Sequence, residues 1–294
     1  MTPDEMREWL AERPRVMDGA TASELLRRGV AAAARLWGVG ALLEAPDAVR
    51  GLHRDYAAAG AEALTAATFR VAPYSLRGAD LETRASELAA LAVRLAREGS
   101  RDAGREALVL TSQATLEDCY RPDLVPDDET LRREHAATAA LLAAAGPDAL
   151  LLETFNTVRE ARIAAEAAAA TGLPVLVSFA CTAGGHLLSG EDVRDAAVAV
   201  SVPGVAAVGV NCTAVQVLSS GLGRIAEVTR LPLIAYANNA WHADDAPWLA
   251  AVPLCPERYA ACALAWAAAG ARLVGGCCGT SPEHIAAVAA LLQR

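Results

Sequence analysis

Lysine is absent from this chain of 294 residues, and all 26 basic residues are arginines. Without lysine, no step can pass through a lysine Schiff base, which excludes the pyridoxal phosphate enzymes. The same absence excludes nucleoside triphosphatases that hold phosphate with a phosphate-loop lysine. The chemistry of this chain must therefore depend on other side chains.

A surplus of positive charge and a long apolar run are also lacking. The formal net charge is −9 and there is no basic cluster, which argues against nucleic-acid binding. No apolar stretch reaches the roughly 18 residues of a membrane span, and the charged N-terminal segment is unlike a secretory signal. Seven cysteines, an odd number, fit a reducing compartment better than a disulfide framework. We therefore predict a cytoplasmic protein with small-molecule substrates and neither nucleic-acid nor membrane partners.

What the chain does have is a repeated alternation of short apolar runs and longer alanine-rich stretches with charges at helical spacing. One run begins about every 36 residues, which suits one strand, one helix and two loops per unit. The eight runs span residues 16–20, 63–69, 107–113, 149–155, 174–180, 206–212, 232–238 and 271–278.

This pattern predicts a single (β/α)8 barrel that occupies residues 1–294 as one domain. Near-continuous apolar strands indicate a sheet covered on both faces. The rival is a doubly wound open sheet, but its GxGxxG mark is absent after the first run. Stretches 128–145 and 158–170 are predicted helices, and a last helix is expected to be capped by Thr280 or Ser281.

Three cysteines follow strands that are expected to end at one face of this barrel. Cys212 ends the sixth run, and Cys277 with Cys278 ends the eighth. Neighbouring strand residues point to opposite faces, so Cys277 and Cys278 can share a ligand only if the backbone leaves strand geometry, which the flanking glycines allow. Three thiolates suit Zn²⁺ and leave a fourth position open, as in catalytic sites. The alternative is that they are small buried core residues, which is how we interpret Cys119, Cys181, Cys255 and Cys262.

The motifs around these cysteines resemble the homocysteine S-methyltransferase family. The resemblance lies in GVNC (209–212), GGCCGTSPEHI (275–285), MDGA (17–20) and LLETF (151–155), in family order along nearly the whole chain. It implies a (β/α)8 barrel with zinc on Cys212, Cys277 and Cys278, and with Asp18 and Glu153 near the amino group of homocysteine. It also implies methyl transfer from a sulfonium donor, S-methylmethionine or S-adenosylmethionine, to the homocysteine thiol, giving methionine.

Further candidates stand at the ends of other runs. We predict that Thr68 and Asn238 contact substrate, and that Trp241 and Trp248 either shape the donor pocket or serve in packing. His186, in a glycine-rich loop, is interpreted as a solvated loop histidine.

Three segments depart from the family pattern around the substrate pocket. DGATAS (18–23), TAATF (65–69) and TSQAT (111–115) stand where the family has a glycine-rich DGAMGT-like turn, TNTF and a GSIGP-like turn. The acceptor is therefore homocysteine with altered contacts, or another thiol or selenol. Two other functions stay open: a non-catalytic zinc barrel, and a phosphate-binding barrel isomerase or lyase that uses GGCCGT for phosphate.

Overall fold

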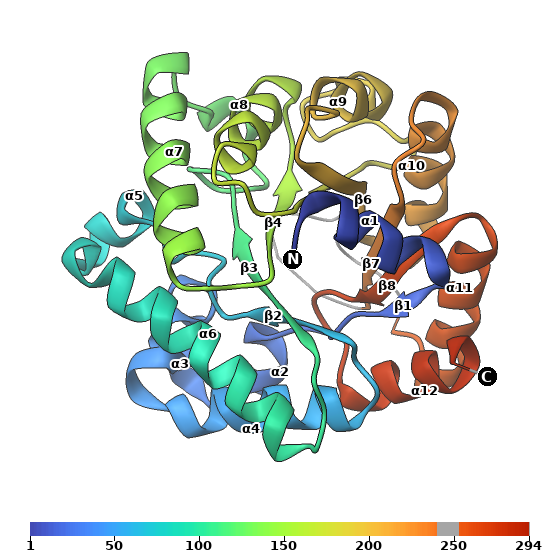
Figure 1. Ribbon diagram of the computed structural model, residues 1–294, viewed down its shortest axis with the longest axis horizontal. Helices are drawn as coiled ribbons and strands as arrows, with labels where there is room; N and C mark the ends of the chain where they lie inside the picture. Colours follow the sequence, from blue (N-terminus) through green and yellow to red (C-terminus); the bar gives the residue numbers. More distant parts are fainter. Residues whose placement is uncertain (240–252, 294) are drawn as a thin grey trace.

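Eight parallel strands form a barrel at the centre of the computed structural model, which describes residues 1–239 and 253–293 (Figure 1). The strand order is β1-β8-β7-β6-β5-β4-β3-β2, and a parallel bridge between Met17 and Ala63 joins the first strand to the second. This arrangement confirms the predicted (β/α)8 barrel. The strands are β1 Arg15–Val16, β2 Ala63–Ala66, β3 Leu108–Gln113, β4 Ala149–Phe155, β5 Val175–Phe179, β6 Val205–Ala214, β7 Leu233–Asn238 and β8 Ala271–Gly276.

The strand ends differ from the predicted ranges at the carboxyl edge of the barrel. β1 ends at Val16, β2 at Ala66 and β8 at Gly276, each earlier than predicted, whereas β6 continues to Ala214. The hydrophobic runs continue past these points with residues that are buried or half-buried, such as Met17, Ala67 and Cys277, although these residues lie outside the strands. Burial and strand pairing therefore separate where the chain turns into the loops.

Helices alternate with the strands and surround the barrel (Figure 1). The predicted helical stretches 128–145 and 158–170 correspond to α7 and α8. Among the described residues, no helix has the length and apolar character to cross a membrane. The helices are α1 Pro3–Glu12, α2 Ala22–Arg27, α3 Val39–Glu44, α4 Pro46–Ala58, α5 Pro73–Leu76, α6 Ala85–Asp102, α7 Asp128–Ala144, α8 Val158–Ala169, α9 Val193–Ala199, α10 Val215–Val228, α11 Pro256–Ala268 and α12 Pro282–Leu292, with 3-10 turns η1 Ala31–Gly38, η2 Arg77–Ala79, η3 Glu82–Arg84 and η4 Pro122–Leu124.

The last helix begins as the sequence predicts. Ser281 is the N-cap of α12 and forms a capping box with His284, while Pro282 opens the first turn. Thr280 does not cap the helix, because its hydroxyl donates to the Cys277 carbonyl at 2.7 Å and accepts from the Ala20 amide at 3.1 Å. It thereby joins the segment after β8 to the segment after β1.

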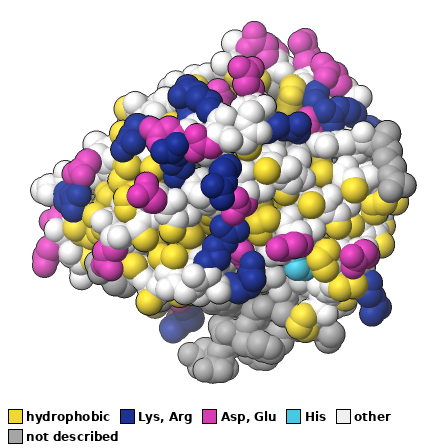
Figure 2. Space-filling model, turned by 90° about the horizontal axis from the view of Figure 1, so that it is seen from below, with side chains coloured by type: hydrophobic (Ala, Val, Ile, Leu, Met, Phe, Trp, Pro, Cys, Tyr) yellow, Lys and Arg dark blue, Asp and Glu magenta, His cyan; other side chains and the backbone are white. Residues whose placement is uncertain are grey.

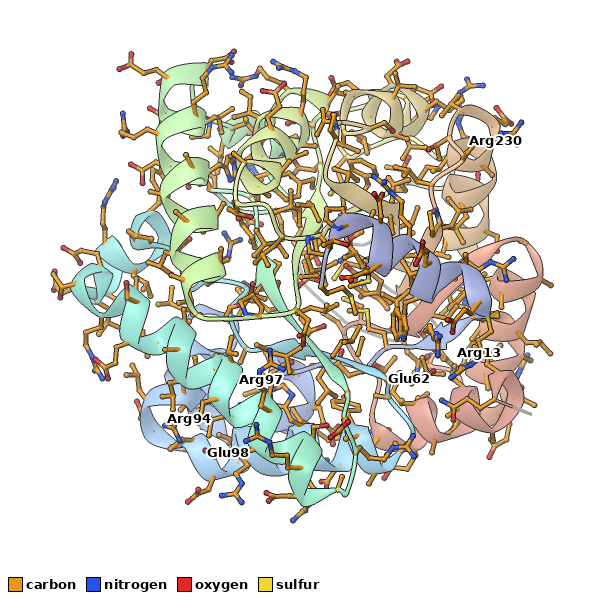
Figure 3. The ribbon with its side chains drawn as sticks, viewed as in Figure 1. Arg13, Glu62, Arg94, Arg97, Glu98 and Arg230 are labelled. Atoms are coloured by element: carbon orange, nitrogen blue, oxygen red, sulfur yellow. The ribbon has the colours of Figure 1, made fainter. Side chains whose placement is uncertain are left out.

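The N-terminal end of the barrel is sealed by α1, which lies across it (Figure 1). Met6 and Leu10 of α1 are fully buried among apolar side chains inside the barrel, such as Leu151 and Ile234. Figure 3 shows Arg13, after this helix, beside Glu62, which precedes β2; their side chains form an ion pair at 2.5 Å. This end of the barrel is a packed core with an ionic rim.

A second apolar layer fills the space between the strands and the outer helices. α6 illustrates it, because Leu88, Ala92 and Leu95 are buried while Arg94 and Glu98 form an exposed ion pair at 3.2 Å (Figure 3). Figure 2 shows acidic and basic side chains interspersed on one side of the molecule. The barrel therefore has a core on both faces of its sheet, as the apolar runs indicate.

Candidate active site

The carboxyl ends of the strands surround a cavity of about 760 Å³, a volume that includes its open mouth. Active sites of such barrels lie at this end. Its wall includes Asp18, Ser112, Glu153, Cys212, Cys277 and Cys278, which come from segments far apart in the sequence.

The three predicted cysteines converge in this cavity. Their sulfur atoms all lie within 4.8 Å of one another, and the Cys212 and Cys278 sulfurs are 4.0 Å apart. Within the described part of the chain, this is the one group of cysteine, histidine and acidic side chains close enough to share a metal ion.

The backbone after β8 explains how two consecutive cysteines face the same point. The strand ends at Gly276, and Thr280 N donates to the Cys277 carbonyl at 3.1 Å, which closes a turn. Cys277 N donates to the Ala237 carbonyl of β7 at 2.9 Å, and Gly276 N donates to the Asp18 carbonyl at 3.0 Å. Both thiols therefore reach the cavity because the chain leaves strand geometry, as the sequence predicts.

Gly275 and Gly276 are required by close approach. A Cβ atom on Gly275 would lie 2.7 Å from the Asp18 carbonyl oxygen, and one on Gly276 would lie 2.3 Å from the Thr280 hydroxyl. Real Cβ atoms do not approach neighbours so closely, so Gly275 lets the β8 end lie against the segment after β1, and Gly276 lets Thr280 pack against the end of β8.

The three thiols strongly affect one another's ionisation. Hydrogen bonds from Cys277 and Cys278 hold the pKa of the Cys212 thiol well below its usual range. Their hydrogen bonds to Cys212, with burial, raise the pKa of Cys277 and Cys278 well above theirs. One thiolate is thus stabilised by two neutral thiols, and three thiolates together need a cation between them. The donor set fits a thiophilic divalent ion.

Two buried carboxyl groups share the cavity with the thiols. Asp18 accepts hydrogen bonds from the Thr65 amide at 2.7 Å and the Thr65 hydroxyl at 3.0 Å, and burial raises its pKa to about 7. Glu153 accepts a hydrogen bond from the Ser112 hydroxyl, and burial raises its pKa to about 8. A cationic group placed between these carboxyls would stabilise their charged forms, so this side of the cavity suits an ammonium group.

Thr68 and Asn238 are not among the residues that line the cavity. The Thr68 hydroxyl accepts from Ser112 N at 2.7 Å and donates to Ser112 O at 2.9 Å, so it holds the residue that donates to Glu153. Asn238 ends β7 fully buried, and its side-chain amide has no hydrogen-bond partner among the described residues. Direct contact of either residue with substrate stays a prediction.

Several other residues that the sequence singled out lie elsewhere. His186 pairs through its backbone with Asp192 in the loop after β5 and does not line the cavity. Cys181 is buried, as expected of a core residue, whereas Cys255 is exposed at the start of α11, so the prediction that it packs in the core is wrong. Trp241 and Trp248 lie outside the described residues.

The sequence interpretation missed the loop between β3 and α7. Cys119 and Tyr120 of this loop line the cavity, and the Tyr120 hydroxyl interacts with the Cys212 sulfur by a hydrogen bond that lowers the pKa of that thiol. Asn156 holds the loop in place, because its amide donates to the Cys119 carbonyl at 2.6 Å. Cys119 is buried as expected, but in the wall of the cavity. Its place in a loop after a strand was the available signal.

Comparison with known proteins gives one consistent result. A family model described as homocysteine S-methyltransferase matches residues 15–292. Homocysteine S-methyltransferase of Escherichia coli K12 is 34% identical over 300 residues, with 94% of both chains covered. YbgG of Bacillus subtilis 168, also a homocysteine S-methyltransferase, is 31% identical over 299 residues, covering 94% of this chain and 93% of the relative.

Two more proteins bear on the site. Selenocysteine Se-methyltransferase of Brassica oleracea var. italica is 28% identical over 301 residues, covering 93% of this chain and 87% of the relative. The metallated form of the homocysteine methyltransferase MmuM from Escherichia coli superimposes with a TM-score of 0.80 at 32% identity, covering 95% of this chain and 96% of that one.

Proposed function

The chain belongs to the homocysteine S-methyltransferase family and is an enzyme of that type, and from this premise we propose its donor, its metal and its site residues. The donor is a sulfonium compound, S-methylmethionine or S-adenosylmethionine. The acceptor is the thiol of homocysteine, and the product is methionine. The metal is Zn²⁺, held by Cys212, Cys277 and Cys278.

The observation that carries this proposal is the convergence of the three sulfurs, within 4.8 Å, in one cavity with two buried carboxyls. Zinc with three thiolate ligands, when bound here, would hold the acceptor sulfur as a thiolate at neutral pH in its open position. The arrangement favours a transferase over a phosphate-binding barrel, in which the paired cysteines would have no role.

The protein groups then hold the acceptor so that its sulfur faces the donor. Asp18 and Glu153 are the proposed partners of the acceptor's ammonium group, whose charge replaces the protons that burial otherwise keeps on these carboxyls. Thr65 and Ser112 fix the two carboxyls through hydrogen bonds, so the acceptor is oriented before reaction. Orientation of two reactants in one cavity is the main contribution expected of these side chains.

A selenol acceptor is a second candidate. The similarity to selenocysteine Se-methyltransferase supports it, as do the departures from the family pattern in DGATAS (18–23), TAATF (65–69) and TSQAT (111–115). A competition assay with equal concentrations of homocysteine and selenocysteine measures the ratio of the two kcat/KM values directly. If kcat/KM is larger for homocysteine, the result supports homocysteine as the acceptor. If it is larger for selenocysteine, the result supports the selenol.

The first experiment is methionine formation from homocysteine, measured by mass spectrometry with reduced, zinc-loaded protein and either S-methylmethionine or S-adenosylmethionine. Product that disappears with a strong chelator and returns with added Zn²⁺ supports the proposal. A protein that retains one zinc and forms no product from either donor contradicts it and supports the non-catalytic zinc barrel. Because the cysteines must stay reduced to bind metal, we also propose the cytoplasm as its compartment.

A further inference from the structure

Two strands of the barrel, β4 and β6, each carry a bulge near their carboxyl end, and each bulge contains a proposed site residue. Between Leu152 and Phe155, β4 has one residue more than its partner β5. Between Asn211 and Ala214, β6 likewise has one residue more than β7. Such bulges redirect side chains, and here they contain Glu153 and Cys212.

Each bulge contains a residue in the left-handed region that is not glycine. Thr154 has φ +65° and Cys212 has φ +44°. This conformation is unfavourable for side chains other than glycine, asparagine and aspartate, above all for a β-branched threonine. Neighbouring interactions must therefore hold these conformations in place.

One side chain connects the two bulges. The Asn211 Oδ1 atom accepts a hydrogen bond from Thr154 N at 2.9 Å, and Asn211 Nδ2 donates to the Thr154 hydroxyl at 2.8 Å. Both residues are almost entirely buried, so water does not compete for these groups. Two hydrogen bonds between the same two residues fix both distance and rotation, which a single bond does not.

The backbone of Asn211 is held in turn. The Thr213 hydroxyl donates to the Asn211 carbonyl at 2.9 Å and accepts from Cys181 N, just after β5, at 2.9 Å. The bulge of β6 is therefore tied to the segment after β5 as well as to β4. The strand between them, β5, stays in register with β6 from Leu176 through Phe179. The hydrogen bonds between Asn211 and Thr154 therefore join the two bulged strands that lie on either side of β5.

We propose that Asn211 is a positioning residue that sets the place of Glu153 relative to Cys212, and thereby the distance between the acceptor's ammonium site and the thiol cluster. The inference rests on the proposed roles of Glu153 and Cys212. Asparagine matches this partner, because its Oδ1 accepts from the Thr154 amide and its Nδ2 donates to the Thr154 hydroxyl. Alanine lacks both groups, and leucine lacks both at similar size.

The decisive experiment compares Asn211→Ala and Thr154→Val with the parent protein, using two measurements that a general loss of stability does not change. The first is the sulfur-to-cobalt charge-transfer spectrum of the Co²⁺-loaded protein, which reports the geometry of the three thiolates. The second is the KM for homocysteine against kcat. For Asn211→Ala we expect an altered cobalt spectrum and a KM raised at least about tenfold, as for other residues that orient metal ligands.

Two further variants keep the result interpretable. Thr154→Ser retains the hydroxyl and is expected to lose less than Thr154→Val in both measurements. Thr111→Val is the matched control, because the Thr111 hydroxyl on β3 is buried without a hydrogen-bond partner among the described residues and its loss should leave both measurements unchanged. If Asn211→Ala does not fold, Asn211→Leu decides the question, because Thr154 lines the cavity and its side chain also hydrogen-bonds to Cys212.

The proposal is overturned if both Asn211→Ala and Thr154→Val have the cobalt spectrum and KM of Thr111→Val and differ only in melting temperature. That outcome would make the Asn211–Thr154 pair a structural feature alone. Failure of the proposed function is seen separately, as a parent protein that forms no methionine; the cobalt spectra of the variants still test the positioning role in that case.

Discussion

The two ends of the barrel use the same strands for opposite purposes. At the N-terminal end, Met6 and Leu10 of α1 fill the barrel with apolar side chains, and ionic groups such as Arg13 and Glu62 lie on the rim. At the C-terminal end, three thiols and two buried carboxyls lie together in one cavity, with left-handed backbone at Thr154 and Cys212. Burial of polar and strained groups costs stability. The packed end therefore stabilises a barrel whose other end is unfavourable in the absence of ligands.

The largest effect is expected from removing one thiol of the cluster. Cys278→Ala leaves two sulfurs, too few for tight zinc binding, so the rate of methionine formation should fall at least about a thousandfold. Zinc content by atomic absorption and methionine by mass spectrometry check this. Cys262→Ala on α11 is the control, because this half-buried cysteine belongs to no metal-binding group among the described residues. A fully active Cys278→Ala protein would refute the assignment of the cluster.

The next effect concerns the stability cost of Asp18. Burial raises the pKa of this carboxyl from 3.8 to about 7, so between these pH values the folded state keeps a proton that the unfolded state has lost. Stability in the metal-free and substrate-free protein should therefore fall as pH rises from about 4 to about 7, by on the order of 4 kcal/mol. Asp18→Asn should remove this contribution to the slope, leave the contribution of Glu153, whose pKa burial raises to about 8, and raise the KM for homocysteine. Denaturant unfolding at a series of pH values measures it, and an unchanged slope would contradict the prediction.

A substitution at the N-terminal end of the barrel should lower stability and leave substrate binding unchanged. Leu10→Ala removes a fully buried side chain of α1 and is expected to lower the free energy of unfolding by about 3 kcal/mol. The KM for homocysteine should stay within about twofold of the parent value, since the cavity is at the other end. Leu264→Ala, at an exposed position of α11, is the control for the loss of a leucine. A large change in KM for Leu10→Ala would show that the two ends are coupled.

The sequence predicts the strands and the thiol cluster better than the bulges and loops around them, because local patterns record the first and not the second. Eight apolar runs and the thiol cluster follow from residue types and regular spacing, which the barrel preserves. The bulges at Glu153 and Cys212 depend on hydrogen bonds between residues far apart in the sequence, such as Thr154 and Asn211, which are 57 positions apart. The placement of Tyr120 depends on the geometry of its loop. No local pattern records such pairs. Thr68 illustrates this, because no local pattern predicts that its hydroxyl forms hydrogen bonds with the Ser112 backbone.

The smallest expected effect lies in the helical layer, away from both ends. His53 of α4 is fully buried without a hydrogen-bond partner among the described residues, and burial lowers its pKa from 6.5 to about 4. Between these pH values the unfolded state binds the proton, so stability should fall as pH decreases, the reverse of the Asp18 slope. The loss should stay below about 1 kcal/mol at pH 6 and reach on the order of 3 kcal/mol near pH 4. His53→Leu should flatten the acid side of the stability curve and leave the Asp18 slope, so parallel curves for parent and variant between pH 6 and 4.5 would contradict the assignment. His53 therefore destabilises the folded protein at low pH, whereas Asp18 and Glu153 destabilise the ligand-free protein as pH rises.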